Sequence, residues 1–316
     1  MRVDGHGERM TGIWYATREQ VAQAPDVQHA AYASERIDSV LESSSRDVEK
    51  LLHIKWLFPM TATLTFDFPE EWGPRYGRVW FNNTPLLSLT SITSGGSAIP
   101  TSEFKLYPSS GPPHNRIELS KASTYGLSVG TTPQQSLSIL GSFGLSSDEE
   151  TLGTITAAIT TTTATTLTAS TSIGVGRLLH IDSERLLVTD KTFVTSAQTG
   201  TLTANNSATT LAVTTGSAFI RGEEIYMDSE RMLIQEIIGN DLVVKRATGG
   251  TVLAAHTTAT IFYGRQLTVK RGAAGTTAAT HSSGATVTAW EIPGPANELC
   301  IAYALWRLLS RSAGWA

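Results

Sequence analysis

The feature that most constrains this fold is an internal duplication. Leu179–Val188 matches Ile225–Ile234 around a shared Asp-Ser-Glu-Arg sequence. A second pair, Val244–His256 and Val269–His281, shares Val-Lys-Arg, a later Gly-Thr and a final His at the same spacing. In each segment apolar residues alternate with other residues in short runs, and turn-forming residues lie at the ends of these runs. This pattern is typical of β-strands.

The copies do not follow one another in tandem. Both front halves come first and both back halves follow. We therefore predict that one β unit is inserted into a connection of another, with an outer unit at 154–194 plus 265–292 and an inner unit at 199–263.

A Thr-rich stretch opens this region. Ten of the eighteen residues from Thr154 to Thr171 are Thr, which is unfavourable in helices and suits a pleated surface. Such a composition also occurs in disordered stalks. The regular return of Leu, Ile and Val favours short strands joined by turns.

The first part of the chain predicts helices. Thr17–Gln20 fits a capping box, and Pro25 is expected to end that short helix. From Gln28 to His53 the spacing of the apolar residues predicts a long amphipathic helix with one buried face. That apolar stripe comprises Ile37, Val40, Leu41, Val48, Leu51 and Leu52.

After Pro59 the apolar period changes to two, which predicts strands. We expect them at 61–68, 78–81, 86–93, 98–107, 116–119 and 136–140. The chain then closes with an apolar helix at Ala296–Ser312, which begins after Pro293 and Pro295. A helix that is apolar nearly all round must be buried, and the stripe of the 28–53 helix is its expected partner.

These elements predict an α+β fold in which a helical scaffold with β-hairpins carries a large, mostly β insertion and is closed by a C-terminal helix. The expected parts are 1–153, the Thr-rich insertion made of two nested β repeats at 154–292, and the completing helix at 293–316.

Charge and cysteine content exclude several classes of function. The net charge is −4, and the insertion carries 10 basic against 10 acidic residues, which gives no attraction to phosphate. One cysteine, Cys300, excludes a disulfide framework and a Cys-based zinc site, and we expect a small buried thiol. No signal peptide is recognised, and the longest apolar run, Leu299–Trp306, is too short for a membrane span.

The duplicated acidic residues allow a catalytic interpretation. Asp182/Glu184 and Asp228/Glu230 could be the carboxylate pair of a hydrolase. The favoured interpretation is structural, because Asp and Ser suit a tight turn and a catalytic pair need not occur twice. His256 and His281 occupy matching repeat positions and are expected to be structural rather than metal ligands. With no nucleotide-binding or nucleophile motif in the sequence, we predict no enzyme activity, cofactor or metal.

Several segments outside the insertion resemble phage head-to-tail adaptor (connector) proteins. The resemblance covers 13–145 and 293–316, about half the chain. The segments that carry it are Thr17–Val21, Ala33–Ile37, Val48–Leu52, Phe66–Pro69, Leu86–Ile92, Tyr107–Pro113, Ile117–Leu119, Ser138–Gly144 and the closing helix. The large β insertion departs from the compact members of that family.

The resemblance implies a structural protein in the neck of a tailed double-stranded DNA phage, assembled in the host cytoplasm. Such proteins form a homo-oligomeric ring, usually twelve-fold, between the portal protein and a stopper or tail-tube protein. DNA passes through the central channel during ejection without sequence-specific binding. The β insertion is expected to face outward, toward neighbouring subunits or the capsid.

In this family the C-terminal end commonly docks on the portal. The resemblance therefore suggests portal-binding roles for the aromatic and basic residues Trp306, Arg307, Arg311 and Trp315, types that are enriched at interfaces. Two alternatives stay open. Trp306 could instead lie in the core, and Arg307 and Arg311 could interact with the dipole at the helix C-terminus. An alternative function for the whole chain is a virion decoration or carbohydrate-binding β module on a helical anchor.

Overall fold

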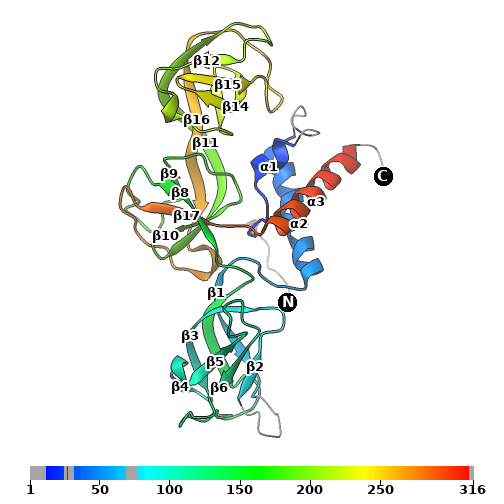
Figure 1. The fold of residues 1–316 in the computed structure, drawn as a ribbon, viewed down its shortest axis with the longest axis vertical. Coiled ribbons are helices and arrows are strands. Elements are labelled where there is room, and N and C mark those ends of the chain that lie inside the picture. The colour runs from blue at the N-terminus through cyan, green and yellow to red at the C-terminus, as the bar shows by residue number, and fades with distance from the viewer. Residues whose placement is uncertain (1–11, 25–26, 28–31, 69–76, 313–316) are drawn as a thin grey trace.

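The structure is a computed structural model that describes residues 12–24, 27, 32–68 and 77–312 (Figure 1). Within these residues the chain forms three α-helices and seventeen strands, which pair into sheets of four, ten and three strands. The predicted helical adaptor scaffold is therefore wrong. The segments with period two form antiparallel sheets along most of the chain, and the helices make only one layer beside them.

The first helix, α1 (Arg18–Ala22), has the predicted capping box. The backbone N–H of Gln20 donates to Thr17 Oγ1 at 3.2 Å, and the backbone N–H of Thr17 donates to Gln20 Oε1 at 2.8 Å. These two bonds satisfy amides that a helix start leaves unpaired. Pro25, which was expected to end this helix, lies outside the described residues.

The second helix, α2 (Ser34–Leu52), buries four residues of its predicted stripe, Ile37, Val40, Leu41 and Val48, and also Ser44 and Ser45. Its predicted start at Gln28 lies outside the described residues. The continuation of the stripe to the last turn is wrong, because Leu51 is 57% exposed and Leu52 42% exposed. This end of α2 extends past the crossing with α3, and no described helix or strand covers it (Figure 1).

The closing helix, α3 (Gly294–Ser312), packs across α2. Every fourth residue from Ala296 is buried: Ala296, Cys300, Ala304 and Leu308. Cys300 Sγ lies 3.5 Å from Ser45 Oγ, and Arg36 donates to the carbonyl oxygen of Leu308 at 3.4 Å. Burial raises the pKa of the Cys300 thiol, which keeps it an unreactive packing group.

A first β module follows α2 and contains two small sheets. The four-stranded sheet has the order β1-β7-β3-β4, with β1 (Met60–Phe66), β3 (Leu86–Ser94), β4 (Ser97–Ile99) and β7 (Leu137–Phe143). The three-stranded sheet has the order β2-β6-β5, with β2 (Arg78–Trp80), β5 (Phe104–Tyr107) and β6 (Arg116–Leu119). The strand predicted at 98–107 is split by a 3-10 turn at Thr101–Glu103, directly after Pro100.

The ten-stranded sheet contains all the remaining strands. Its path is β12-β15-β14-β13-β16-β11-β10-β17-β8, and β9 also pairs with β16. The strands are β8 (Glu149–Thr154), β9 (Thr166–Thr168), β10 (Leu178–Ile181), β11 (Glu184–Leu202), β12 (Thr210–Ala212), β13 (Glu224–Met227), β14 (Glu230–Ile238), β15 (Asp241–Lys245), β16 (His256–Lys270) and β17 (Thr286–Trp290). The long strands β11 and β16 pair with each other through four register shifts, and they run through both repeat units (Figure 1).

The duplicated sequences adopt the same hairpin. Ile181 pairs with Glu184 across the first turn, and Met227 pairs with Glu230 across the second. In both turns the Asp that opens the turn has a positive φ, 54° at Asp182 and 49° at Asp228. Asp tolerates this left-handed conformation better than most residues because its short side chain can bond locally.

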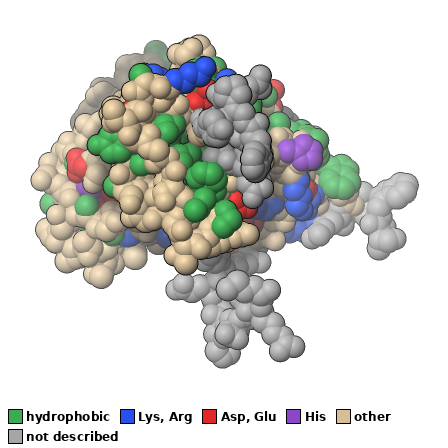
Figure 2. All heavy atoms as spheres, turned by 90° about the horizontal axis from the view of Figure 1, so that it is seen from below, with side chains coloured by type: hydrophobic (Ala, Val, Ile, Leu, Met, Phe, Trp, Pro, Cys, Tyr) green, Lys and Arg blue, Asp and Glu red, His purple; other side chains and the backbone are tan. Residues whose placement is uncertain are grey.

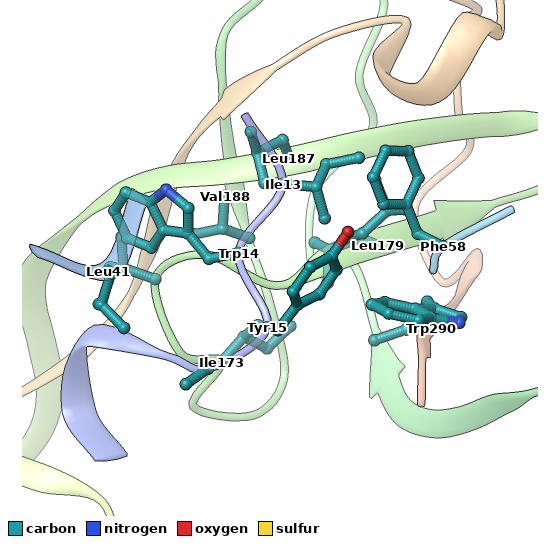
Figure 3. Close-up of a cluster of buried hydrophobic side chains, with 14 of the residues drawn as sticks. Ile13, Trp14, Tyr15, Leu41, Phe58, Ile173, Leu179, Leu187, Val188 and Trp290 are labelled. Atoms are coloured by element: carbon teal, nitrogen blue, oxygen red, sulfur yellow. The ribbon is translucent and has the colours of Figure 1, made fainter. Parts of the chain in front are cut away.

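The helices share one hydrophobic core with the outer repeat unit. Trp14 and Tyr15, which precede α1, pack among Leu179, Leu187 and Trp290 of the ten-stranded sheet (Figure 3). The Tyr15 and Trp290 rings meet edge to face, with centroids 6.0 Å apart. The inner unit has a separate core around Leu211, Met232 and Ile261, and the first β module has a third. The helical layer therefore depends on the outer unit for its burial.

A close approach joins the outer unit to the first β module. A side chain at Gly275 would clash with the carbonyl oxygen of Thr61 in β1, and the φ of Gly275 is +76°. Beside it, Arg185 donates to Thr61 Oγ1 at 3.4 Å. Glycine is required at position 275 because a side chain would clash with β1 and because other residues rarely adopt this positive φ.

Candidate functional site

The duplicated polar residues form a network at one end of the outer unit. Arg271 donates to both carboxylate oxygens of Glu184, at 2.8 and 2.7 Å. The amides of Gly272 and Ala279 also donate to this carboxylate, at 2.8 and 2.9 Å. Nε2 of His281 lies 2.9 Å from Glu184 Oε2, and its Nδ1 lies 2.7 Å from Asp182 Oδ2.

The inner unit repeats this network. Arg246 donates to both oxygens of Glu230 at 2.7 Å, and the amides of Ala247 and Ala254 donate at 2.9 and 3.0 Å. His256 lies between Glu230 and Asp228, with contacts of 3.0 and 2.7 Å. The two glutamates and the two histidines are buried.

Each arginine also donates to backbone carbonyl oxygens in two loops. Arg271 donates to the carbonyl oxygens of Thr161, Ala164 and Ala279. Arg246 donates in the same way to Thr203, Ala208 and Ala254. A guanidinium has five N–H donors in a fixed plane, so one side chain can close several loops at once. The Thr-rich stretch is thereby fixed to the sheet.

The electrostatics of the two glutamates follow from these contacts. Burial alone would raise the pKa of Glu184, but the bonds from Arg271, two amides and His281 outweigh it and lower the pKa to about 2. The same balance, with Arg246 and His256 as partners, lowers the pKa of Glu230 to about 2. A carboxylate that is this acidic and fully bonded is a poor proton donor or base near neutral pH.

The structure thus brings together the residues of the possible hydrolase pair, but in a closed arrangement. Every oxygen of Glu184 and Glu230 accepts hydrogen bonds from groups that stabilise the fold. Among the described residues, no group of three or more His, Cys, Asp or Glu side chains is arranged to hold a metal ion. This geometry gives the two networks a structural role.

A third buried ion pair lies between the repeat units and was not recognised in the sequence. Arg265 of β16 donates to both oxygens of Glu223 at 2.7 Å. It also donates to Ser170 in the outer unit and to Ala218 in the inner unit, at 2.8 and 2.9 Å. The sequence feature that could have indicated this ion pair is a departure from the repeat, since Glu223 occupies the position that Arg177 has in the outer copy.

The expected portal-binding residues lie at the end of α3. Trp306 is 65% exposed, so it is no part of the core. Arg307 pairs with Asp47 of α2 and so contributes to helix packing. Arg311 lies in the last turn of α3, and nothing is described of its side chain; Trp315 lies outside the described residues. The expected portal-binding site therefore stays a prediction.

No protein-family model, curated protein or solved structure matches this chain. In the part of the chain that the structure describes, no helix has the length and apolar character needed to cross a membrane.

Proposed function

We propose that this chain is a structural subunit of the neck of a tailed double-stranded DNA phage. In this proposal, copies of the chain form a ring between the portal and the stopper or tail tube. DNA passes through the ring without specific contacts. The expected number of subunits in the ring, twelve, comes from the resemblance alone.

The observation that carries the proposal is where the resembling segments lie. They form the three helices and the first β module, and the ten-stranded sheet is built from Glu149–Trp290 between them. The resemblance thus ends where the ten-stranded sheet begins, although the helices share a core with that sheet and the resembling segments contain more sheet than a helical scaffold.

The chemistry of the charged groups supports a structural protein. The buried carboxylates Glu184, Glu223 and Glu230 each bind an arginine that in turn holds loop carbonyls. The net charge of −4 also suits a channel through which DNA must slide, because each basic contact to phosphate would slow it.

Electron microscopy of the purified full-length protein tests the proposal. Rings with a central hole, and binding of those rings to portal-bearing heads, are the expected results. The predominance of strands keeps the surface-binding β module as the second candidate. Monomers that bind glycans on an array and do not bind heads would favour that module and contradict the ring.

A further inference from the structure

The outer face of the three-stranded sheet β2-β6-β5 carries a row of aromatic and basic side chains. Arg116 in the central strand pairs across the sheet with Trp80 on one side and with Tyr107 on the other. The next residues, Val79, Ile117 and Leu106, form a row that packs into the core of the first β module. Because side chains alternate along strands, the Trp80–Arg116–Tyr107 row faces outward.

The row is held in place by its own contacts. The Arg116 guanidinium lies 5.0 Å from the centre of the Trp80 ring and 4.5 Å from that of Tyr107. Glu118, in the second outward row, accepts from Nε of Arg116 at 2.9 Å and from Nε of Arg78 at 2.7 Å. The hydrogen bonds described for these arginines use Nε, so their outer N–H groups can still donate to a partner.

The composition of this face is that of a binding surface. Trp80 is 45% exposed and lies on this face beside the guanidinium of Arg116, which also contacts the ring of Tyr107. Trp, Tyr and Arg dominate the energetics of interfaces, and side chains that are already ordered lose less entropy on binding. Three basic residues, Arg78, Lys105 and Arg116, against Glu118 give the face a net charge of +2. We call these residues, with Trp80 and Tyr107, the basic patch. Figure 2 views this end of the molecule from below.

An acidic surface lies on another module. Asp148, Glu150 and Glu291 are all exposed at one end of the β8–β17 pair. Glu150 pairs with Ala289, and the amide of Glu291 donates to the carbonyl oxygen of Asp148 at 2.8 Å. Because side chains alternate along a strand, these three lie on one face, and Glu149, which contacts His180 and Thr288, lies on the other. Glu150 also contacts Arg177. We call Asp148, Glu150 and Glu291 the acidic patch.

We propose that the basic patch of one copy of this chain binds the acidic patch of a second copy. The two patches are complementary in charge and lie on different modules of the same chain. A contact between two different surfaces of identical chains is head-to-tail, and it closes into a ring when the rotation allows. This inference rests on the proposed function, because it names the contact that would join the ring.

A second copy fits the basic patch better than nucleic acid does. The Trp80 ring has the Arg116 and Arg78 guanidinium groups 5.0 and 5.9 Å from its centre, so its π-system is already engaged by cations of the same sheet. An acidic protein surface can bind through the outer N–H groups of the two arginines and the edge of the Trp80 ring alone. The same chain provides such a surface.

The test uses two reciprocal charge reversals in the full-length protein. Lys105→Glu/Arg116→Glu makes the basic patch acidic, and Asp148→Lys/Glu291→Lys makes the acidic patch basic. Glu236→Lys/Asp241→Lys, at exposed positions of the inner unit, is the matched control. Sedimentation velocity at low salt and at high salt measures assembly, and circular dichroism checks that each variant is folded.

We expect each reversal alone to raise the concentration needed for assembly by about tenfold or more, because like charges then face each other. An equimolar mixture of the two variants should assemble again, since every contact in an alternating ring is then between opposite charges. Trp80→Ser, which removes no charge from the patch, should weaken assembly as well. High salt should weaken assembly of the parent protein.

Rings that form equally well in both reversed variants would overturn this inference and leave the proposed ring intact. Loss of assembly in both variants without recovery in the mixture would also overturn it, because the two patches would then not meet each other. A parent protein that stays monomeric, or one whose basic patch binds an oligonucleotide instead, would contradict both proposals.

Discussion

Arg265 and Glu223 form a two-bond ion pair where the inner repeat unit joins the outer one, with both N···O distances 2.7 Å. The guanidinium spans the two units, since it also donates to Ser170 on one side and Ala218 on the other. The two units have separate hydrophobic cores. This pair is therefore a buried polar link between the two units, in addition to the long strands β11 and β16 that run through both.

Removing one partner of this link should be costly. Arg265→Leu leaves the buried Glu223 carboxylate without its cation, which typically costs about 3–5 kcal/mol. We expect a lower midpoint of urea unfolding, or a separate early transition of the inner unit. Glu236→Gln, at an exposed site of the same unit, is the control and should change the midpoint little. Equal effects of the two substitutions would show that Arg265 does not link the units.

The networks around Glu184 and Glu230 predict sensitivity to acid. Both carboxyls have a pKa near 2 in the folded protein, against about 4.3 in an unfolded chain. A lowered pKa stabilises the fold above pH of about 4.3, and that stability is lost as the pH falls through about 2. Melting temperatures measured between pH of about 5 and 2 should fall steeply for the parent protein. The variant Glu184→Gln/Glu230→Gln should be less stable at neutral pH and show a shallower fall. A slope equal to that of the parent would contradict the assignment.

Local patterns predicted much of the secondary structure. The capping box at Thr17, the buried face around Leu41 and the turn at Asp182 each depend on residues a few positions apart. Such short-range rules can be applied to one sequence without knowing its partners.

Long-range packing was not predictable in the same way. The period of the apolar residues shows that α2 has a buried face, but not that Trp14 and Tyr15 cover the outer unit. The fold class was wrong because sheets make up most of the chain and the helices form one layer that shares the core of the outer unit, so they are not a scaffold. The Arg265–Glu223 link joins residues 42 positions apart, and the repeat did not reveal it because it occurs once.

The inner unit should be removable. Val194 and Tyr263 pair across β11 and β16, so an Asn-Gly turn in place of residues 195–262 would join them as a tight hairpin. The core that the helices share with the outer unit would remain. None of the seven Trp residues lies in the removed segment. We therefore expect a soluble chain with an unchanged tryptophan emission maximum.

The matched deletion removes 154–292 and takes Leu179, Leu187 and Trp290 from the shared core. That shorter chain should expose Trp14 and Tyr15 and aggregate. A folded, soluble product from this deletion would show that the helices do not depend on the outer unit.

Two leucines of α2 provide a direct test of the helical layer. Leu41 is fully buried, and Leu51, ten residues later, is 57% exposed. Leu41→Ala should lower the free energy of unfolding by about 2–5 kcal/mol. Leu51→Ala should change it by about 0.5 kcal/mol or less. Thermal denaturation of both variants measures the difference, and similar losses would place Leu51 in a covered position.

Substitution of Trp306 tests partner binding of the proposed neck protein separately from its folding. Its side chain is 65% exposed on α3, so Trp306→Ala removes little packing and should leave the melting temperature nearly unchanged. If this surface docks on the portal, the variant should bind portal-bearing heads at least tenfold more weakly, as expected for a large aromatic residue at an interface. Asp47→Asn is the control, because it weakens the internal pair with Arg307 and should affect helix packing instead. Full head binding by Trp306→Ala would exclude the end of α3 as the docking surface.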